Sequence, residues 1–445
     1  MNTDISYNHI LKYFKMDYQI MLNTHNTIYS CIYSCFATTN KWLENILAEE
    51  LTNLGATNTI TTNAGVKFDA DFTTIMRCNL HSRIASRIMI QVGFGGYRNE
   101  DDIYSLAFNI KWADWFDLNN NIKVATNAIN SPLRSLEFVT LKVKDAICDN
   151  FSKLYNERPN VNKYAPDMRI YNFLTMDTIT IYLDTSDEGL FKRGYRQNTL
   201  EAPLKENLAA GLLKLANWQP HIPLYDPMCG SGTIPMEAIS IGLNIAPGLN
   251  RGFAFEKFVC MINYEDTWHK MKSDAKNAIN YNNQSLKIYA SDINQQAINA
   301  THDNLKRAKL LDYITLNCGD FLQLPAPNVE NSEKEIEPIG VINAIKVVET
   351  IEPAREIKTI ETKGMILTNP PYGVRLDELE NLADFYPKLA SHLKQNYAGW
   401  VCYFLTADLR MPKLMRLKPS RKTPVFNGAL ECRLFEFKMV SGSNR

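Results

Sequence analysis

The chain has 445 residues, more than one domain usually contains, so two or three domains are expected. Its hydrophobic fraction of 45% and charged fraction of 22% are typical of globular proteins. No apolar run approaches the roughly 18 residues of a membrane span, and the formal net charge of zero neither favours nor excludes a nucleic-acid partner.

Nine cysteines are scattered along the chain, and none forms a Cys-x-x-Cys pair. The seven histidines show no metal-ligand spacing, so we expect no metal site and a reducing, cytoplasmic compartment. Residues 1–29 are polar and lack the basic start and apolar centre of a secretory signal. We interpret this segment as an N-terminal extension.

Residues 30–190 predict an α+β region in which helices cover one face of small sheets. A helix capped by Asn40 follows the first strand. A second, amphipathic helix at 73–89 carries Arg83 and Arg87. The other expected elements are strands at 32–37, 66–68, 88–92 and 121–127, helices at 101–112 and 136–155, and two strands within 168–183.

Residues 191–445 change to repeated strand–helix units, the pattern of a doubly wound sheet. The expected strands are at 224–226, 286–291, 314–318, 365–368, 400–405 and 429–440, and the helices at 204–215, 233–241, 294–310 and 382–396. Two insertions interrupt the pattern, at 246–283 and at 325–363. We expect the second to be a surface excursion.

A glycine-rich turn joins the first strand to the first helix of this region, in the segment Asp226-Pro227-Met228-Cys229-Gly230-Ser231-Gly232-Thr233. Gly230 and Gly232 allow a ligand to approach the backbone at a helix N-terminus. A carboxylate at Asp226 repels a pyrophosphate but suits a cationic amine, which favours S-adenosylmethionine (SAM) over a dinucleotide. Nothing nearby activates Cys229 as a nucleophile, so we interpret it as part of the cofactor wall.

Two more acids follow strands of the same sheet. Asp292 ends the second strand, where a carboxylate can accept both ribose hydroxyls of an adenosine; the alternative is that it caps the following helix. Asp320 follows the third strand, where an adenine amino group can be met; the alternative is a turn-forming role.

The segment Asn369-Pro370-Pro371-Tyr372 follows the fourth strand, at the same carboxyl edge. Its prolines remove two backbone donors and leave the Asn369 side-chain oxygen and the Pro370 carbonyl as acceptors for an exocyclic NH2 group. Tyr372 offers a face on which a base can stack. The alternative is a strand-ending turn. We predict that Asn369, Pro370 and Tyr372 are the catalytic residues. They position an amine for in-line methyl transfer, and no general base is needed before the attack.

Both motifs resemble those of bacterial ribosomal RNA large-subunit guanine-N2 methyltransferases that carry a THUMP domain. The resemblance extends to Ala246-Pro247-Gly248, Ser291-Asp292, Gly319-Asp320, Arg193-Gly194-Tyr195-Arg196 and the segments 205–210, 82–89, 141–147 and 158–161. It implies a ferredoxin-like plus THUMP RNA-binding region at 30–190, then a Rossmann-like class I methyltransferase domain at 191–445. It also implies SAM as methyl donor and N2 of one guanine in large-subunit (23S) ribosomal RNA as acceptor.

The resemblance further implies residue roles. Asp226, Gly230 and Gly232 line the methionine side, Asp292 binds the ribose, and Asp320 lies near the adenine. Glu206 falls in a segment that resembles the family's extra cofactor-side helix start. Many relatives continue into a second methyltransferase domain, so we expect that activity to be absent here or to lie on another chain.

We predict that basic side chains from both regions contact RNA. Residues 410–422 form the clearest basic stretch, for which a solvated loop is the alternative. The predicted RNA-binding residues are Arg83, Arg87, Arg134, Lys142, Lys144, Arg193, Arg196, Lys418 and Arg421.

Three rival functions stay open at this point. A DNA adenine methyltransferase uses the same amine pocket, although the THUMP-like region argues against DNA. A THUMP-type tRNA guanine methyltransferase shares the architecture. A non-catalytic ribosome-assembly protein could keep the RNA-binding region without turnover.

Overall fold

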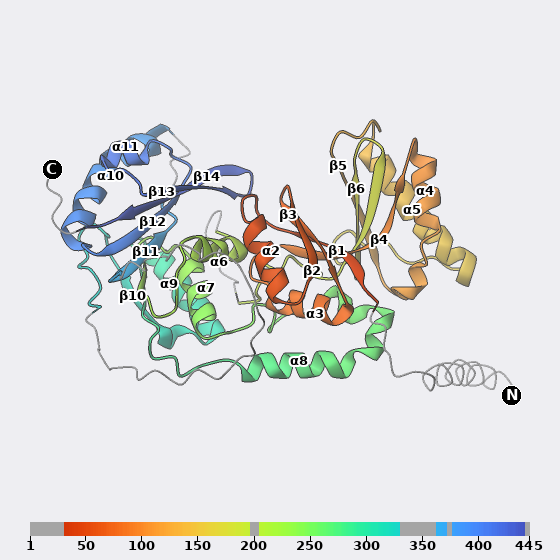
Figure 1. Cartoon of the computed structure of the whole chain (residues 1–445), viewed down its shortest axis with the longest axis horizontal. Helices are drawn as coiled ribbons and strands as arrows, with labels where there is room; N and C mark the ends of the chain where they lie inside the picture. Colours follow the sequence, from red (N-terminus) through yellow and green to blue (C-terminus); the bar gives the residue numbers. More distant parts are fainter. Residues whose placement is uncertain (1–30, 196–203, 330–361, 372–375, 441–445) are drawn as a thin grey trace, which may run out of the picture.

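The computed structural model describes residues 31–195, 204–329, 362–371 and 376–440. Two seven-stranded sheets dominate the molecule, one in each half of the chain (Figure 1). Within these ranges, no helix combines the length and the apolarity needed to cross a membrane.

The N-terminal half forms one continuous sheet with the order β2-β3-β1-β4-β7-β6-β5, where small separate sheets were predicted. Strand β4 joins its two parts, because it pairs with β1 on one side and with β7 on the other. The strands are β1 (Tyr33–Thr38), β2 (Thr57–Thr62), β3 (Gly65–Ala70), β4 (Arg87–Gly96), β5 (Ile122–Ala128), β6 (Met168–Leu174) and β7 (Thr178–Asp184).

Four helices cover one face of this sheet, because alternate strand residues such as Phe68, Ile90 and Ile181 are apolar and buried. Helices α4 and α5 lie together on the outer side of β4, β5 and β6 (Figure 1). The four helices are α2 (Glu44–Asn53), α3 (Phe72–His81), α4 (Glu100–Phe108) and α5 (Leu136–Tyr155).

Two local predictions in this half are wrong. Asn40 does not cap α2, which begins at Glu44; its side chain donates to the Phe426 carbonyl 3.0 Å away in the other half. The helix predicted at 73–89 ends at His81, because the backbone N–H groups of Arg83 and Ile84 bond to the carboxylate of Glu50 instead of continuing the helix. Residues after this turn enter β4.

The C-terminal half has the strand order β10-β9-β8-β11-β12-β14-β13. The first five strands in this order are parallel, and β14 runs antiparallel to β12. The strands are β8 (Leu224–Asp226), β9 (Ile288–Asp292), β10 (Ile314–Cys318), β11 (Gly364–Thr368), β12 (Trp400–Thr406), β13 (Arg421–Asn427) and β14 (Leu430–Lys438). A doubly wound sheet was predicted, and this is one.

Helices of this half follow the predicted strand–helix rhythm. They are α6 (Glu206–Leu215), α7 (Thr233–Gly242), α9 (Gln295–Ala308) and α10 (Leu376–Asn396). The basic stretch at 410–422 is a short helix, α11 (Met411–Met415), a connector and the start of β13, which pairs with β14 along its length. The alternative of a solvated loop is therefore wrong for residues 411–415, which are helical, and for Arg421 and Lys422, which belong to β13.

The insertion at 246–283 packs beneath the N-terminal half. It forms two short 3-10 turns, η2 (Ala254–Lys257) and η3 (Val259–Asn263), and then α8 (Glu265–Asn277). Its aromatic residues enter the N-terminal core: the Phe72 ring lies 6.2 Å from that of Phe255 and 4.8 Å from that of Tyr264. The two halves therefore share one continuous hydrophobic core.

Candidate active site at the carboxyl edge of the parallel sheet

Strands β8, β9, β10 and β11 are parallel, so their carboxyl ends meet at one edge of the sheet. Asp226 ends β8, Asp292 ends β9, and Asn369 directly follows β11. The backbone N–H of Gly319, after β10, donates to the Asp292 carbonyl at 3.0 Å. The fold thus brings the predicted cofactor residues and the predicted amine-binding segment to the same edge.

The glycine turn crosses from β8 to α7 in a left-handed conformation, with φ of 54° at Gly230 and 82° at Gly232. A Cβ built on Gly230 meets no atom within 4 Å, whereas one on Gly232 would lie 2.7 Å from Cγ2 of Thr301. Gly230 therefore leaves open space beside the backbone for a ligand. At Gly232 close packing also requires a glycine, because Thr301 of α9 approaches the turn there.

Helix α9 holds this turn in place. The Thr301 hydroxyl donates to the Gly230 carbonyl at 2.8 Å, and the Asn304 side chain donates to the Ser231 carbonyl at 3.2 Å. These bonds turn the carbonyls toward α9. A fixed backbone at the start of α7 costs little reorganisation when a ligand binds.

Asp226 is buried and its carboxyl group is held from the neighbouring strand. Its Oδ1 accepts from the Thr368 hydroxyl at 2.7 Å and from the Met228 N–H at 3.2 Å. Burial raises the pKa of Asp226 to about 7, although these two hydrogen bonds oppose the shift. A cation placed beside this carboxyl group would stabilise its ionised form.

Asp292 joins β9 to the glycine turn. One of its oxygens accepts from the Gly230 N–H and the other from the Asn294 N–H, both at 2.9 Å. The cap of α9 is Asn294, whose side chain accepts from the Gln296 N–H. The helix-capping alternative for Asp292 is therefore wrong, and each of its oxygens keeps a second lone pair for a ligand.

Asp320 forms a tight turn after β10. Its side chain accepts from the Leu322 N–H at 3.0 Å, and its carbonyl accepts from the Leu324 N–H at 3.0 Å. These bonds confirm the turn-forming role of Asp320. Its proximity to the adenine stays a prediction. The turn buries the Phe321 ring, whose centroid lies 4.9 Å from that of His392.

The predicted amine-binding segment begins immediately after fully buried Thr368. Asn369 is half-buried, Pro370 is buried and Pro371 is exposed. Tyr372 lies outside the described residues. The hydroxyl of Thr368, which precedes the predicted acceptors, links this segment to the cofactor turn through Asp226.

Cys229 and Glu206 lie around the same turn. Burial raises the pKa of the Cys229 thiol well above its usual range, with Asp226 and Asp292 adding to the shift, so the thiol stays protonated. Glu206 is the buried first residue of α6, and the adjacent Leu204 carbonyl accepts from the Thr233 hydroxyl at 3.4 Å. The start of α6 thus lies beside the start of α7, and the cofactor-side role of Glu206 stays a prediction.

Three predicted RNA-binding arginines have structural partners instead. Arg193 is buried and pairs with Glu237 at 3.2 Å, and Arg83 donates to the Ile245 carbonyl at 2.5 Å. Arg87 pairs with buried Asp184. Phosphates need accessible cations, so the prediction that Arg83 and Arg193 bind RNA is wrong. Arg87 offers little free charge to a phosphate because it is paired with Asp184.

The other predicted RNA contacts vary in accessibility. Arg134, Lys418 and Arg421 are exposed. Lys142 pairs with Asp101 and Lys144 with Asp145. Arg196 lies outside the described residues.

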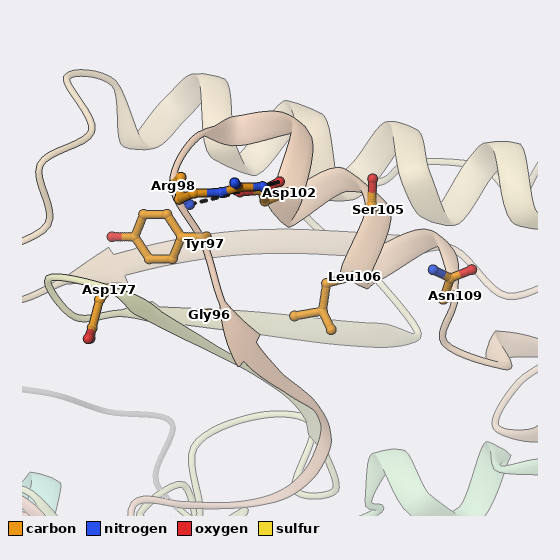
Figure 2. A pocket seen from close by; sticks show the side chains of 8 residues that line it. All are labelled: Gly96, Tyr97, Arg98, Asp102, Ser105, Leu106, Asn109 and Asp177. Carbon is orange, nitrogen blue, oxygen red and sulfur yellow. Dashed lines mark hydrogen bonds and ion pairs between the residues drawn. The ribbon is translucent and has the colours of Figure 1, made fainter.

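A surface hollow of about 600 Å³ lies far from this edge, where β4 meets α4. Figure 2 shows Arg98 and Asp102 paired at the start of α4, with the Leu106 side chain pointing from the same helix toward the strands. The remaining lining residues are Gly96, Tyr97, Ser105, Asn109 and Asp177. No predicted site residue lines it. In the described part of the chain, no group of three or more His, Cys, Asp or Glu side chains could hold a metal ion.

Family models match nearly the whole described chain. An RMKL-like methyltransferase domain matches residues 193–342 and 328–436, which together span more than half of the sequence. The chain belongs to the RMKL-like methyltransferase family. A THUMP domain matches residues 97–184, and an RlmL ferredoxin-like domain matches residues 34–89. These matches confirm the predicted family and fold class; β4 is the strand at which the ferredoxin-like and THUMP parts meet.

Curated relatives include a ribosomal RNA large subunit methyltransferase K/L from Aeromonas hydrophila, 35% identical over 417 residues, covering 92% of this chain and 54% of that protein. A protein of the same name from Marinomonas is 32% identical, and the matched region covers 93% of this chain and 54% of that protein. The chain therefore spans about half the length of the curated relatives it matches.

Solved structures match over nearly their full lengths. SMU.472, crystallised with SAH, has a TM-score of 0.76 and 27% identity, with coverage of 93% of this chain and 99% of that chain. A predicted N6-adenine-specific DNA methylase from Listeria monocytogenes has the same TM-score, 29% identity, and coverage of 93% and 99%. TrmN from Thermus thermophilus, at 16% identity and a TM-score of 0.61, shares the fold.

Proposed function

We propose that this protein transfers a methyl group from SAM to the exocyclic N2 amine of one guanine in large-subunit (23S) ribosomal RNA. The observation that carries this proposal is the link between the two motifs. The Thr368 hydroxyl, one residue before Asn369, bonds to the carboxyl group of Asp226 at 2.7 Å, so the cofactor turn and the amine-binding segment share one edge. The relatives named ribosomal RNA large subunit methyltransferase K/L support the choice of RNA.

The residues at this edge fit SAM, which would supply an electrophilic methyl group on a cationic sulfonium. Open space beside Gly230 admits a ligand to the backbone. Buried Asp226 would face a cationic amine better than a phosphate. Asp292, fixed by the Gly230 N–H, has lone pairs left for ribose hydroxyls. SAH bound to SMU.472, a protein that matches 93% of this chain, supports this cofactor class.

The target amine would be held by acceptors, because an exocyclic NH2 has two hydrogens to donate. The side-chain oxygen of Asn369 and the carbonyl of Pro370 are the two acceptors that we propose. Bonds to both hydrogens shift electron density onto the nitrogen and favour tetrahedral geometry, which prepares its lone pair for attack. The proton then leaves after the methyl group has transferred. Positioning therefore accounts for most of the catalysis.

RNA would reach this edge across both halves of the molecule. The exposed cations Arg134, Lys418 and Arg421 are proposed phosphate contacts, with smaller contributions from Lys142 and Lys144, which already have acidic partners. A ribosomal RNA substrate implies action in the cytoplasm.

The test is transfer of labelled methyl from SAM to large-subunit rRNA purified from a strain that lacks this protein, followed by nucleoside analysis. We expect N2-methylguanosine in the rRNA and none in parallel reactions with tRNA or duplex DNA. Modification of tRNA would keep the chemistry and overturn the substrate. Absence of transfer to purified rRNA and to large-subunit assembly intermediates, with SAM still bound, would contradict the proposal and favour a non-catalytic assembly role.

A further inference from the structure

Among the described residues, no helix of the N-terminal half packs on the second face of its sheet. Met89, Tyr182 and Asp184 on this face are buried, and its exposed part lies around Phe94 and Phe173. Helices α2 to α5 all pack on the face that holds Phe68, Ile90 and Ile181. The opposite face carries exposed side chains on both sheet halves, among them Lys67 on β3 and Phe94 on β4. In Figure 1 helices α4 and α5 lie outside strands β4 to β6, and the inner side of these strands has no helix against it.

Two phenylalanine rings stand on this open face in one row. Phe94 on β4 and Phe173 on β6 both pair in register with Thr180 on β7, so the three side chains point the same way. Phe94 is 60% exposed and Phe173 36%. Strand spacing places the two rings roughly 10 Å apart, with a hydroxyl between them.

The surroundings of the rings keep their faces accessible. The next strand position on the open side of Phe94 is Gly96, where even a Cβ would approach nothing closer than 3.6 Å. Beside Phe173 on β5 is Asn127, an exposed polar residue. A flat ring flanked by polar groups offers a stacking face, which is how single-stranded nucleic acids are held on sheets.

Cations border the same face. Lys67 is exposed at one end, and Lys123 on β5 donates to the carbonyl of Lys163, which places two lysines together at the other end. The acids at strand positions of this face are Asp184, buried against Arg87, and Asp69, which accepts from Ser34 on β1. Exposed Asp177 lies in the turn between β6 and β7, beside Gly96, so phosphates are expected at the opposite end of the rings, where Lys123 lies.

A protein partner fits this surface less well. A protein interface buries a continuous apolar centre. Here the described strand residues of the open face include one large aliphatic side chain that is more than half exposed, Ile60, and it lies on the far edge strand β2. The other rings of this face, Phe36, Tyr171 and Tyr182, are half-buried or buried, and Thr180 separates Phe94 from Phe173.

We infer that the open face of the N-terminal sheet binds an unpaired segment of the substrate RNA, with bases stacked on Phe94 and Phe173 and phosphates beside Lys123. This inference rests on the proposed function for its choice of RNA. It adds a specific surface and a preference for single-stranded over paired nucleotides.

The inference is tested by measuring how the full chain binds two RNAs, a short single strand and a fully paired hairpin. Fluorescence anisotropy would give both affinities over a range of salt concentrations. Phe94→Ala and Phe173→Ala should each weaken single-strand binding about tenfold and hairpin binding far less. Neither phenylalanine variant changes the charge, so the salt dependence of binding should stay as in the wild type. Lys123→Ala should reduce the slope of log affinity against log salt concentration by about one.

Matched variants separate stacking from other contacts. Phe94→Tyr should bind as the wild type, and Phe94→Leu, which keeps apolar area but loses the flat ring, should bind as weakly as Phe94→Ala. Tyr155→Ala, which removes an exposed ring at the end of the outer helix α5, should have no effect. Unchanged single-strand affinity in both alanine variants would overturn the inference, as would wild-type binding by Phe94→Leu. A wild-type dimer that both alanine variants dissociate would assign the face to self-association instead.

The methyl-transfer assay run on the same proteins distinguishes the two proposals. A wild type that methylates rRNA, with alanine variants that bind as it does, overturns this inference alone. A wild type that binds single-stranded RNA through the two rings but methylates no rRNA supports the surface and overturns the proposed function.

Discussion

Arg193 and Glu237 form an ion pair in which each side chain is no more than 3% exposed. Arg193 lies in the segment between β7 and α6, and Glu237 lies in α7. Arg193 also donates to the carbonyl of Arg83, and the Arg83 guanidinium lies 3.9 Å from Glu237. Since α7 begins at the glycine turn, this cluster fixes the helix of the proposed cofactor site to the N-terminal half.

Glu237→Ala should therefore destabilise the protein strongly. It leaves two buried guanidinium groups without their carboxylate, a change that costs about 3–5 kcal/mol in comparable sites. Urea unfolding would measure the loss. The control is Glu431→Ala, which removes the exposed partner of Arg433 and should change stability by less than about 1 kcal/mol. Equal effects of the two variants would contradict the assigned role of Glu237.

Asn369→Ala should abolish methyl transfer and leave SAM binding largely intact, because the residue is proposed to hold the target amine and not the cofactor. Turnover with rRNA and calorimetric titration with SAM would be measured on the same preparation. Asn369→Asp is an informative companion, since it keeps two acceptor oxygens but adds a charge. Retained turnover in the alanine variant would exclude the amine-positioning role.

Asp292→Ala should weaken SAM binding by tenfold or more. It removes the proposed ribose acceptor and also the bond that holds the Gly230 N–H. Asn294→Ala, which removes the true cap of α9, is the matched control and should cost about 1 kcal/mol of stability with a smaller effect on affinity. If both variants bind SAM as the wild type does, Asp292 is a structural residue only.

SAM affinity should rise with pH between 5 and 7. In the free protein the pKa of Asp226 is raised to about 7, chiefly by burial, so its carboxyl group takes up a proton below that pH. A cationic amine favours the ionised form, and binding must therefore release this proton. Because the folded pKa is above the unfolded value, Asp226 also lowers the stability of the free protein as pH rises through this window.

Asp226→Asn tests both statements, because an amide does not titrate here. Its SAM affinity should be weaker and flat from pH 5 to 7, and calorimetry in buffers of different ionisation enthalpy should show no proton release by this residue. The same pH profile in the wild type and in the variant would show that another group titrates.

Gly230→Ala and Gly232→Ala should separate the ligand from the packing role of the turn. Both force a left-handed alanine, at about 1–2 kcal/mol. Only the Gly232 variant adds a collision with Thr301, so it should be the less stable of the two by thermal unfolding. Gly230→Ala should instead lose more SAM affinity than Gly232→Ala does. If Gly230→Ala is the less stable variant and binds SAM as the wild type does, the open space assigned to Gly230 is contradicted.

Local patterns predicted the parallel sheet well, since β8, β9 and β11 are short buried runs, each followed by a turn and a helix. The positions of Asp226, Asp292 and Asn369 at one edge followed from that order. Thr368 was missed, although it directly precedes the Asn-Pro-Pro segment, because a strand threonine carries no signal until its partner is known.

The failures all involve partners distant in sequence. The helix at 73–89 was overextended because its apolar spacing continues, while Glu50 supplies the acceptors that end it. Arg83 and Arg193 looked available for phosphate because Glu237 lies 44 residues beyond Arg193. Strand β13 was hidden in a basic stretch, since its pairing with β14 decides its structure.

The segment that joins α7 to β9 has a consequence for how such a protein can be divided. It runs beneath the N-terminal half, where the Val259 N–H bonds to the Trp115 carbonyl and Phe255 enters the aromatic cluster around Phe72. A gene cut at residue 190 would separate these partners and expose apolar surface on both products. The N-terminal half and the methyltransferase-family domain are thus not interchangeable modules: a chimaera that exchanges one of them must also replace this connecting segment.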